Sequence, residues 1–322
     1  MKKKKLGLSI ICNTCLFASL FILCCTGAKT AWEAIEDPQF KNGLALTPLN
    51  PSIVQEKGGF ENACVDTLSF SQIKQLPVWK IAQWYSKYTL KDASCSKNQD
   101  GSITYANQAK KVIWHTDGEM TLELKASKEY ERPRESNDVW PHLLLEQSFT
   151  RHPNIGKVGK ILFNIGLKLE YCSIEMPDSC YNPDIHTAQF PIYFVLKNIN
   201  KKSHDYNTFI WFGIPTYDYR YPQMLEKEKI SWDKGTSTYI YNVSQISVWG
   251  HITFTDRQWH YAQIDLLPLV KRCVEKMKAK GYFLSTQYDD LEICGMNLGW
   301  EIPGTFDAAI SIGNLSLYIT DK

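Results

Sequence analysis

The sequence predicts an all-β fold, an antiparallel jelly-roll β-sandwich with one α-helix near the C-terminus. Segments rich in β-branched and aromatic residues recur from Val78 to the end of the chain, and turn-forming stretches such as residues 97–102 and 303–307 separate them. Only one stretch between them has helical periodicity. Many strands at fairly regular spacing with little helix are typical of an antiparallel sandwich.

The expected strands follow an N-terminal region without regular patterning. They are residues 78–90, 111–115, 120–127, 142–149, 161–174, 190–199, 208–214, 236–243, 251–255, 259–265, 291–300 and 308–319. Alternation is clearest in 161–170, where Ile161, Phe163, Ile165, Leu167 and Leu169 share one face and Asn164, Lys168 and Glu170 share the other. We therefore expect one dry face and one face that meets water or a ligand.

The single helix is expected directly after residue 265. Asp265 is a suitable N-cap and Pro268 fits the first turn, while apolar residues recur at helical spacing up to Met277. Lysines crowd the C-terminal end, which suits the helix dipole, and Gly281 ends the helix. We interpret this basic cluster as a solvated helix face rather than a site for a polyanion.

The first 28 residues have the pattern of a secretory signal peptide. Lysines at 2–5 precede a largely apolar run over 6–25, and Thr26 and Ala28 provide small residues for cleavage after Ala28. The first alternative is an uncleaved membrane anchor. The second is a lipoprotein, because Cys24 and Cys25 end the apolar run. We expect a secreted, periplasmic or cell-surface protein with an irregular segment over 29–60 and one sandwich domain over 61–322.

Composition excludes several classes of partner. The chain has 322 residues and a formal charge of +2, and removing the four lysines of the first 28 residues leaves −2. A nucleic-acid binder would show a basic surplus, so no nucleic-acid partner is expected. A membrane partner is expected only through an N-terminal anchor.

Six cysteines follow the predicted signal peptide: Cys64, Cys95, Cys172, Cys180, Cys273 and Cys294. An even number in an exported protein allows three disulfides, and buried free thiols are the alternative. Neither these cysteines nor the scattered histidines show metal-ligand spacing. We expect no metal and no cofactor.

The C-terminal part of the sequence resembles known proteins. The order strand, helix, glycine, strand, followed by GMNLGWEIPGTFDAAISIGNLSLYI (295–319), resembles the closing portion of carbohydrate-active jelly-roll sandwiches of the concanavalin-like and galactose-binding-like groups. WPHLLLEQSF (140–149) is similar to their central strands. The ExDxxE motif of laminarinase-type glycosidases and the RxExR, QIH and YFKxGxY segments of alginate-lyase-type jelly rolls are absent. The resemblance implies a carbohydrate ligand.

The first candidate site is the stretch 131–149. Arg132 and Arg134 lie in a polar loop, and Trp140 leads into a strand on which His142 and Glu146 share the face opposite two leucines. Strand rise places His142 and Glu146 about 13 Å apart. A tryptophan that stacks on a sugar ring, with polar groups for its hydroxyls, is one interpretation. A polar loop with a buried tryptophan and a hydrogen-bonded histidine is the other.

The second candidate site is the stretch 210–224. Trp211 lies on a strand, and Tyr217, Tyr219 and Arg220 follow in a loop bounded by prolines. Mixed aromatic and charged residues on one loop are typical of a ligand rim. An aromatic lid over one end of the sandwich is the alternative.

These observations favour an exported carbohydrate-binding protein that recognises a glycan or polysaccharide. The alternative is a polysaccharide lyase or glycoside hydrolase on the same scaffold, and a surface module with a protein partner is the third class. A lyase would draw its base, acid and cations from His142, Tyr219, Arg132 and Arg134. A glycoside hydrolase would need two of the carboxylates Glu146, Glu170 and Glu301 close together.

Overall fold

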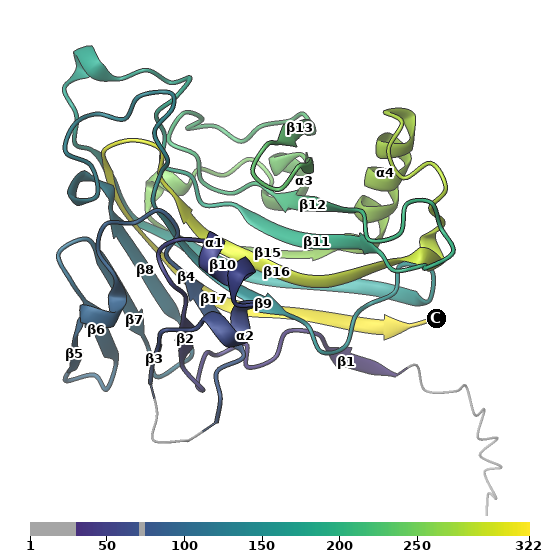
Figure 1. Cartoon of the computed structure of the whole chain (residues 1–322), viewed down its shortest axis with the longest axis horizontal. Coiled ribbons are helices and arrows are strands. Elements are labelled where there is room, and N and C mark those ends of the chain that lie inside the picture. Colours follow the sequence, from purple (N-terminus) through teal and green to yellow (C-terminus); the bar gives the residue numbers. More distant parts are fainter. Residues whose placement is uncertain (1–29, 71–74) are drawn as a thin grey trace, which may run out of the picture.

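The computed structural model describes residues 30–70 and 75–322, which fold into two packed β-sheets (Figure 1). Sheet A has eight strands in the order β15-β10-β17-β8-β7-β6-β5, with β1 paired to β17, and sheet B has nine in the order β13-β14-β12-β11-β16-β9-β4-β2-β3. The strands of sheet A are β1 (Ala31–Glu33), β5 (Ser94–Lys97), β6 (Ile103–Ala106), β7 (Lys110–Trp114), β8 (Met120–Lys125), β10 (Val158–Ile174), β15 (His260–Asp265) and β17 (Phe306–Asp321). The strands of sheet B are β2 (Leu44–Leu46), β3 (Asp66–Leu68), β4 (Trp79–Ala82), β9 (His142–Ser148), β11 (Ile192–Asn198), β12 (Phe209–Ile214), β13 (Lys229–Asp233), β14 (Thr238–Asn242) and β16 (Leu291–Glu301).

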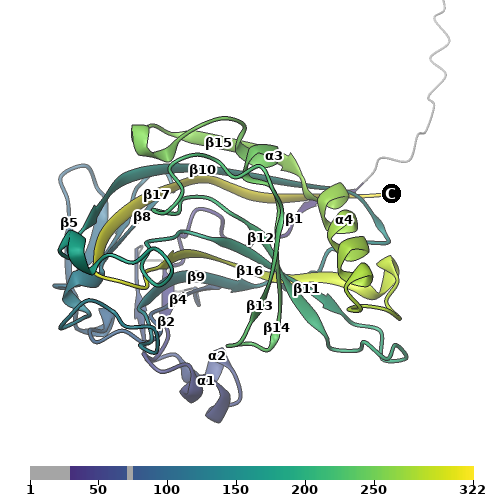
Figure 2. The same ribbon diagram turned by 90° about the horizontal axis from the view of Figure 1, so that it is seen from above.

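The predicted two-sheet β-sandwich is therefore confirmed. Neighbouring strands are antiparallel except for the parallel pairs β2–β4 and β12–β14. The long strands β10 and β17 pair along most of their length and curve together over sheet B (Figure 2). Register shifts interrupt their pairing in three places, and such bulges let a long strand pair bend.

The core lies between the two sheets and follows the alternation of the sequence. Ile161, Phe163, Ile165, Leu167 and Leu169 are all buried, whereas Asn164, Lys168 and Glu170 on the same strand are partly exposed. On β9 the same rule buries Leu143 and Leu145 and leaves His142 and Glu146 on the outward face. The sequence-based assignment of faces is thus confirmed on both strands.

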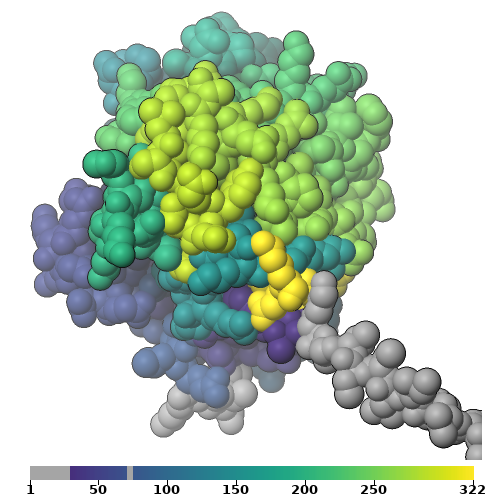
Figure 3. Space-filling model, turned by 90° about the vertical axis from the view of Figure 1, so that its right-hand side faces the viewer, coloured from purple at the N-terminus to yellow at the C-terminus, as the bar shows by residue number. Residues whose placement is uncertain are grey.

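The predicted C-terminal helix is α4, Leu266–Ala279. The Asp265 carboxylate accepts a hydrogen bond from the backbone N–H of Leu267, as an N-cap does, and Val270, Cys273 and Met277 pack into the core. Figure 3 looks onto this end of the molecule and shows the yellow-green atoms of the α4 region above the yellow C-terminal residues. Three shorter helices were not anticipated: α1 (Ser52–Glu56), α2 (Phe60–Ala63) and α3 (Gln245–Trp249).

Substitution of Gly281 tests the end of α4. Gly281 has φ of +82°, and a Cβ atom there would meet nothing within 4 Å, so only backbone strain opposes a side chain. We expect Gly281→Ala to lower the free energy of unfolding by about 1 kcal/mol. Gly281→Asn should lower the free energy of unfolding by less, because asparagine tolerates the left-handed region of backbone conformation. Equal losses for both variants in urea unfolding would contradict this explanation.

Two expected strands differ from the structure. The segment 78–90 is a strand only over β4, because Tyr85 has φ of +55° and the Gln83 side chain binds Thr47 and Leu90 instead of continuing a ladder. The expected strand over 251–255 is wrong: the chain forms a 3₁₀ turn over Phe254–Asp256, and Phe254 is buried there. The segment 29–60 contributes β1, β2 and α1.

The remaining expectations concern cysteines and the N-terminus. The predicted disulfides are not supported, since Cys64, Cys95, Cys172, Cys180, Cys273 and Cys294 are all free thiols in the structure. The predicted signal peptide at residues 1–28 lies outside the described residues. Within residues 30–70 and 75–322, none of the helices has the length and apolar character that a membrane crossing requires.

Candidate functional site

The outward face of sheet B gathers most of the side chains predicted to act on a ligand. We call it the sheet B face and define it by His142 and Glu146 on β9, Asn297 and Glu301 on β16, and Tyr193 on β11. Adjacent strands place His142 opposite Glu301 and Glu146 opposite Asn297. The inward neighbours on β9 and β16 are core residues, so alternation fixes these side chains on the outer side.

A chain of polar contacts runs from β16 to the loop after β12. Glu301 accepts a hydrogen bond from the Gln189 amide at 2.9 Å, and the Gln189 oxygen accepts one from Arg220 at 3.3 Å. Arg220 forms an ion pair with Asp218, whose carboxylate also accepts from the Thr187 hydroxyl at 2.6 Å. Arg220 is therefore held at the rim of the face with its charge neutralised.

Aromatic rings surround His142. The Trp140 ring stacks on the imidazole with centroids 5.8 Å apart, and the exposed Tyr85 ring lies 5.9 Å away on another side. The Arg134 guanidinium lies over Trp140 at 5.0 Å. Burial lowers the pKa of His142, although the charge of Glu301 opposes the shift. His142 is accordingly neutral near pH 7.

Glu146 lies further along β9, between β4 and β16. It is opposite Lys80 on one side and Asn297 on the other. Burial raises the pKa of Glu146 to about 7, against the opposing effects of the Trp84 indole and the Lys80 ammonium. Lys80 itself pairs with Glu61 at 2.5 Å. Glu146 is thus a carboxyl group that is about half protonated near neutral pH.

Several buried polar atoms on this face have no hydrogen-bond partner among residues 30–70 and 75–322. They are Oε2 of Glu146, Oδ1 of Asn297, Nδ1 of His142 and Nε1 of Trp140. Buried polar groups are normally paired, so a group of unpaired ones on neighbouring strands marks a place where a ligand or water binds. Two of the four atoms, Oε2 of Glu146 and Oδ1 of Asn297, belong to residues directly opposite each other on paired strands. Oδ1 accepts hydrogen bonds, whereas Oε2 accepts when the carboxyl group is ionised and donates when it is protonated.

Trp211 and Tyr193 continue the face toward the other edge of the sheet. Their rings are 6.0 Å apart, and the Trp211 indole donates to the Thr236 hydroxyl. A small cavity of about 110 Å³ opens beside Tyr193 and is also lined by Gln189, Asp218 and Arg220. The face therefore carries rings on both sides of its polar centre.

One end of the sheet B face is covered. Helices α1 and α2 pack Val54, Phe60 and Ala63 against Trp84 and Leu144 in a small separate apolar cluster. In this cluster the helices meet the sheet at β4 and β9, where Leu144 lies between His142 and Glu146 on the outward face. A ligand would approach from the side of β16 and β11.

The remaining predicted residues lie away from this centre. Arg134 is buried and donates to the carbonyl groups of Asp138, Ser136 and Ile185, and Arg132 forms an exposed ion pair with Asp138. Both arginines shape the loop before β9.

The two predicted tyrosines pack against other rings. Tyr217 is 7% exposed with its ring edge-on to Trp300, although it also borders the small cavity. Tyr219 packs against Phe306.

Sequence reasoning missed Asn297, Gln189, Lys80 and Trp84. Asn297 and Glu301 lie four residues apart on β16, separated by the buried Leu298 and Trp300, so alternation would have placed them together. Gln189, Lys80 and Trp84 join the site through pairing between distant segments, and no local pattern along the chain indicates such pairing. No group of three or more His, Cys, Asp and Glu side chains within the described ranges is placed to hold a metal ion.

Comparisons with known proteins find similarity among solved structures alone. No protein-family profile matches the sequence, and no curated protein matches it. Endoglucanase Cel12A from Rhodothermus marinus is 9% identical, with 71% of this chain and 97% of that chain covered at a TM-score of 0.38. A family 12 xyloglucanase from Bacillus licheniformis is 11% identical with the same coverage and TM-score. Endoglucanase 3 from Trichoderma harzianum, of family GH12, is 8% identical, covering 72% and 97% at 0.36.

Proposed function

We propose that this protein is an exported carbohydrate-binding protein whose ligand lies on the sheet B face. The observation that carries the proposal is the group of unpartnered buried atoms beside aromatic rings: Oε2 of Glu146, Oδ1 of Asn297 and Nε1 of Trp140. A sugar hydroxyl both donates and accepts, so neighbouring hydroxyls of one ring can satisfy acceptors and an indole donor together. The C–H face of the ring packs on an aromatic side chain.

Charge on this face suits a neutral glycan. Arg220 is neutralised by Asp218, Lys80 by Glu61, and His142 carries no charge near pH 7. A polysaccharide lyase needs free cations beside the uronate carboxylate, but Arg132 and Arg134 are occupied by Asp138 and by backbone carbonyls. The arrangement therefore disfavours the lyase alternative.

Glycoside hydrolysis is the second candidate, and the position of Gln189 favours it. The backbone of Gln189 forms isolated β-bridges with both Asp218 and Glu301, so these two residues lie on either side of it with their Cα atoms about 10 Å apart. Inverting glycosidases hold their carboxyl groups about 6.5–9.5 Å apart. The raised pKa expected of a general acid belongs instead to Glu146, which strand rise places about 13 Å from Glu301. Binding without hydrolysis fits this separation better.

Removal of the Trp140 ring tests the binding proposal. We expect Trp140→Ala to weaken binding of the best ligand from a glycan array at least tenfold, because the ring and its indole N–H are both lost. The melting temperature should change little. Trp232→Ala removes a half-exposed tryptophan on β13, outside the face, and should leave affinity unchanged.

Activity assays separate the two candidates. Reducing ends released from the bound glycan, and lost in Glu301→Gln, would establish hydrolysis. Absorbance at 235 nm would reveal the unsaturated product of a lyase. Binding without either signal supports a binding protein, and the absence of any glycan binding or turnover would refute both candidates.

A further inference from the structure

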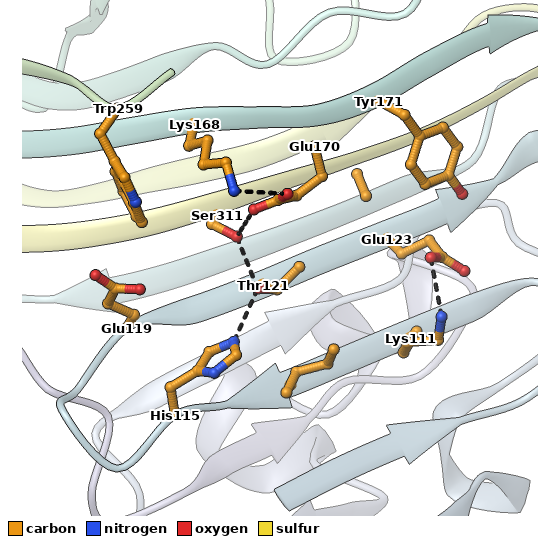
Figure 4. A pocket seen from close by; sticks show the side chains of 12 residues that line it. Lys111, His115, Glu119, Thr121, Glu123, Lys168, Glu170, Tyr171, Trp259 and Ser311 are labelled. Atoms are coloured by element: carbon orange, nitrogen blue, oxygen red, sulfur yellow. Dashed lines mark hydrogen bonds and ion pairs between the residues drawn. The ribbon is translucent and has the colours of Figure 1, made fainter. Parts of the chain in front are cut away.

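The outward face of sheet A contains a separate trough, on the opposite side of the sandwich from the sheet B face. It crosses β7, β8, β17 and β10 and encloses about 440 Å³, within the usual range of ligand pockets. Charged side chains line both walls, and Trp259 and Tyr171 lie toward opposite ends (Figure 4). Nothing in the sheet B proposal uses these residues.

The floor of the trough is made by small residues. Ala309 and Ser311 point outward from the middle strand β17, and Gly313 follows at the next outward position. Longer side chains rise on both sides, from Lys168 and Glu170 on β10 and from Thr121 and Glu123 on β8. A row of small residues between rows of large ones creates the hollow.

The charged walls are paired internally. Lys111 contacts Glu123 at 3.0 Å, and Lys168 contacts Glu170 at 3.1 Å. These pairs leave the trough with little net charge, and the polar atoms hold fixed positions. A strongly charged ligand would have to break the ion pairs, whereas a neutral polar ligand can use their remaining lone pairs and N–H groups.

A hydrogen-bonded chain crosses the floor from the turn after β7 to β10. His115 contacts the Thr121 hydroxyl at 3.1 Å, Thr121 contacts Ser311 at 2.8 Å, and Ser311 donates to Glu170 at 2.7 Å (Figure 4). The chain joins three strands and orients each hydroxyl. It gives the trough the preorganised polar surface that a hydroxyl-rich ligand needs.

One end of the trough combines a ring with a free acceptor. Trp259 lies close to Gly313, where an added Cβ atom would meet both the indole and the Glu119 side chain at 3.4 Å. Within the described part of the chain the Glu119 carboxylate makes no hydrogen bond or ion pair, and burial raises its pKa. The Trp259 ring stacks on Tyr261 with ring centroids 5.9 Å apart, so one of its two faces is already covered. The rest of the ring and the Glu119 carboxyl group border the same space.

We propose that this trough is a second carbohydrate site, which takes a short neutral saccharide chain with one ring stacked on Trp259. Glu119 receives hydroxyl groups of that ring, and Tyr171 borders the opposite end. The distance from Gly166, which lies opposite Gly313, to Tyr171 is about 16 Å by strand rise, long enough for more than one sugar ring. The site goes beyond the proposed function, since it lies on the other sheet and needs none of its residues.

The test measures saccharide binding by calorimetry in the full chain, using the neutral oligosaccharides that a glycan array selects. Two variants address the trough: Trp259→Ala removes the ring, and Ala309→Leu fills the floor without touching the ion pairs. We expect each variant to weaken the binding of at least one oligosaccharide tenfold or more. Trp140→Ala on the sheet B face should leave the affinity for that oligosaccharide unchanged. Trp232→Ala is the control for loss of a tryptophan.

Each outcome decides the question. Loss of saccharide affinity in both trough variants, with an unchanged melting temperature, supports the second site. If Trp259→Ala does not fold, Ala309→Leu alone decides. Saccharide binding that depends on Trp140 but on neither trough variant overturns the second site and leaves the proposed function intact. Binding that depends on the trough variants and not on Trp140 refutes the sheet B proposal alone, and no saccharide binding overturns both.

Discussion

Trp300→Ala should lower the free energy of unfolding by about 3–5 kcal/mol, the usual range for truncation of a buried aromatic side chain. Trp300 is fully buried on the inward face of β16, and its ring packs edge-on against Phe190 at 5.3 Å. Its indole N–H donates to the carbonyl of Leu122 on β8 at 2.9 Å, so one side chain links sheet B to sheet A. Urea unfolding measures the loss directly.

One further variant separates the packing of the Trp300 ring from its hydrogen bond, and a second, at another tryptophan, is the control. Trp300→Phe keeps most of the packing but removes the donor to Leu122, so it should lose about 1–3 kcal/mol. Trp232→Ala, at a half-exposed position, should stay within about 0.5 kcal/mol of the parent protein. A loss in Trp300→Ala no larger than in Trp232→Ala would contradict the assignment of Trp300 to the core.

The parts of the fold that the sequence predicted are those governed by local patterns. Alternation in β9 and β10 depends only on neighbouring residues, and it correctly placed Leu143 inward and Lys168 outward. The helix α4 was predictable because Asp265 and Gly281 mark its ends within one segment. Short strands such as β2 carry too few residues to show a period, and pairing with β3 and β4 defines them.

The candidate site was predictable to the same extent. His142 and Glu146 share a strand face, so their common side could be read from the sequence. Their partners could not, because Asn297 and Lys80 lie opposite Glu146 only through the register of β16 and β4. The six cysteines show the opposite case, where an even count suggested disulfides that the packing does not form. Spacing along the chain does not determine which side chains meet.

Glu146→Gln should abolish a stability change that the parent protein shows between pH 4 and pH 8. The folded-state pKa of about 7 lies above the ordinary value of 4.5, so in this interval the folded protein keeps a proton that the unfolded chain has lost. The contribution of Glu146 to the free energy of unfolding is therefore largest below pH 4.5, and it is lost as the pH rises through 7. The difference corresponds to about 3 kcal/mol at most.

The measurement compares the unfolding free energies of the parent protein and Glu146→Gln at each pH, since other titrating groups cancel in the difference. Glutamine has the shape of the protonated carboxyl group but cannot ionise, so the variant should gain stability relative to the parent by up to about 3 kcal/mol as pH rises. Glu131→Gln, at a side chain that is 86% exposed, is the matched control and should show no such trend. A flat difference for Glu146→Gln would mean that the carboxylate is solvated in the folded protein. The unpartnered Oε2 would then be paired with water, and the sheet B face would lose the observation on which its ligand rests.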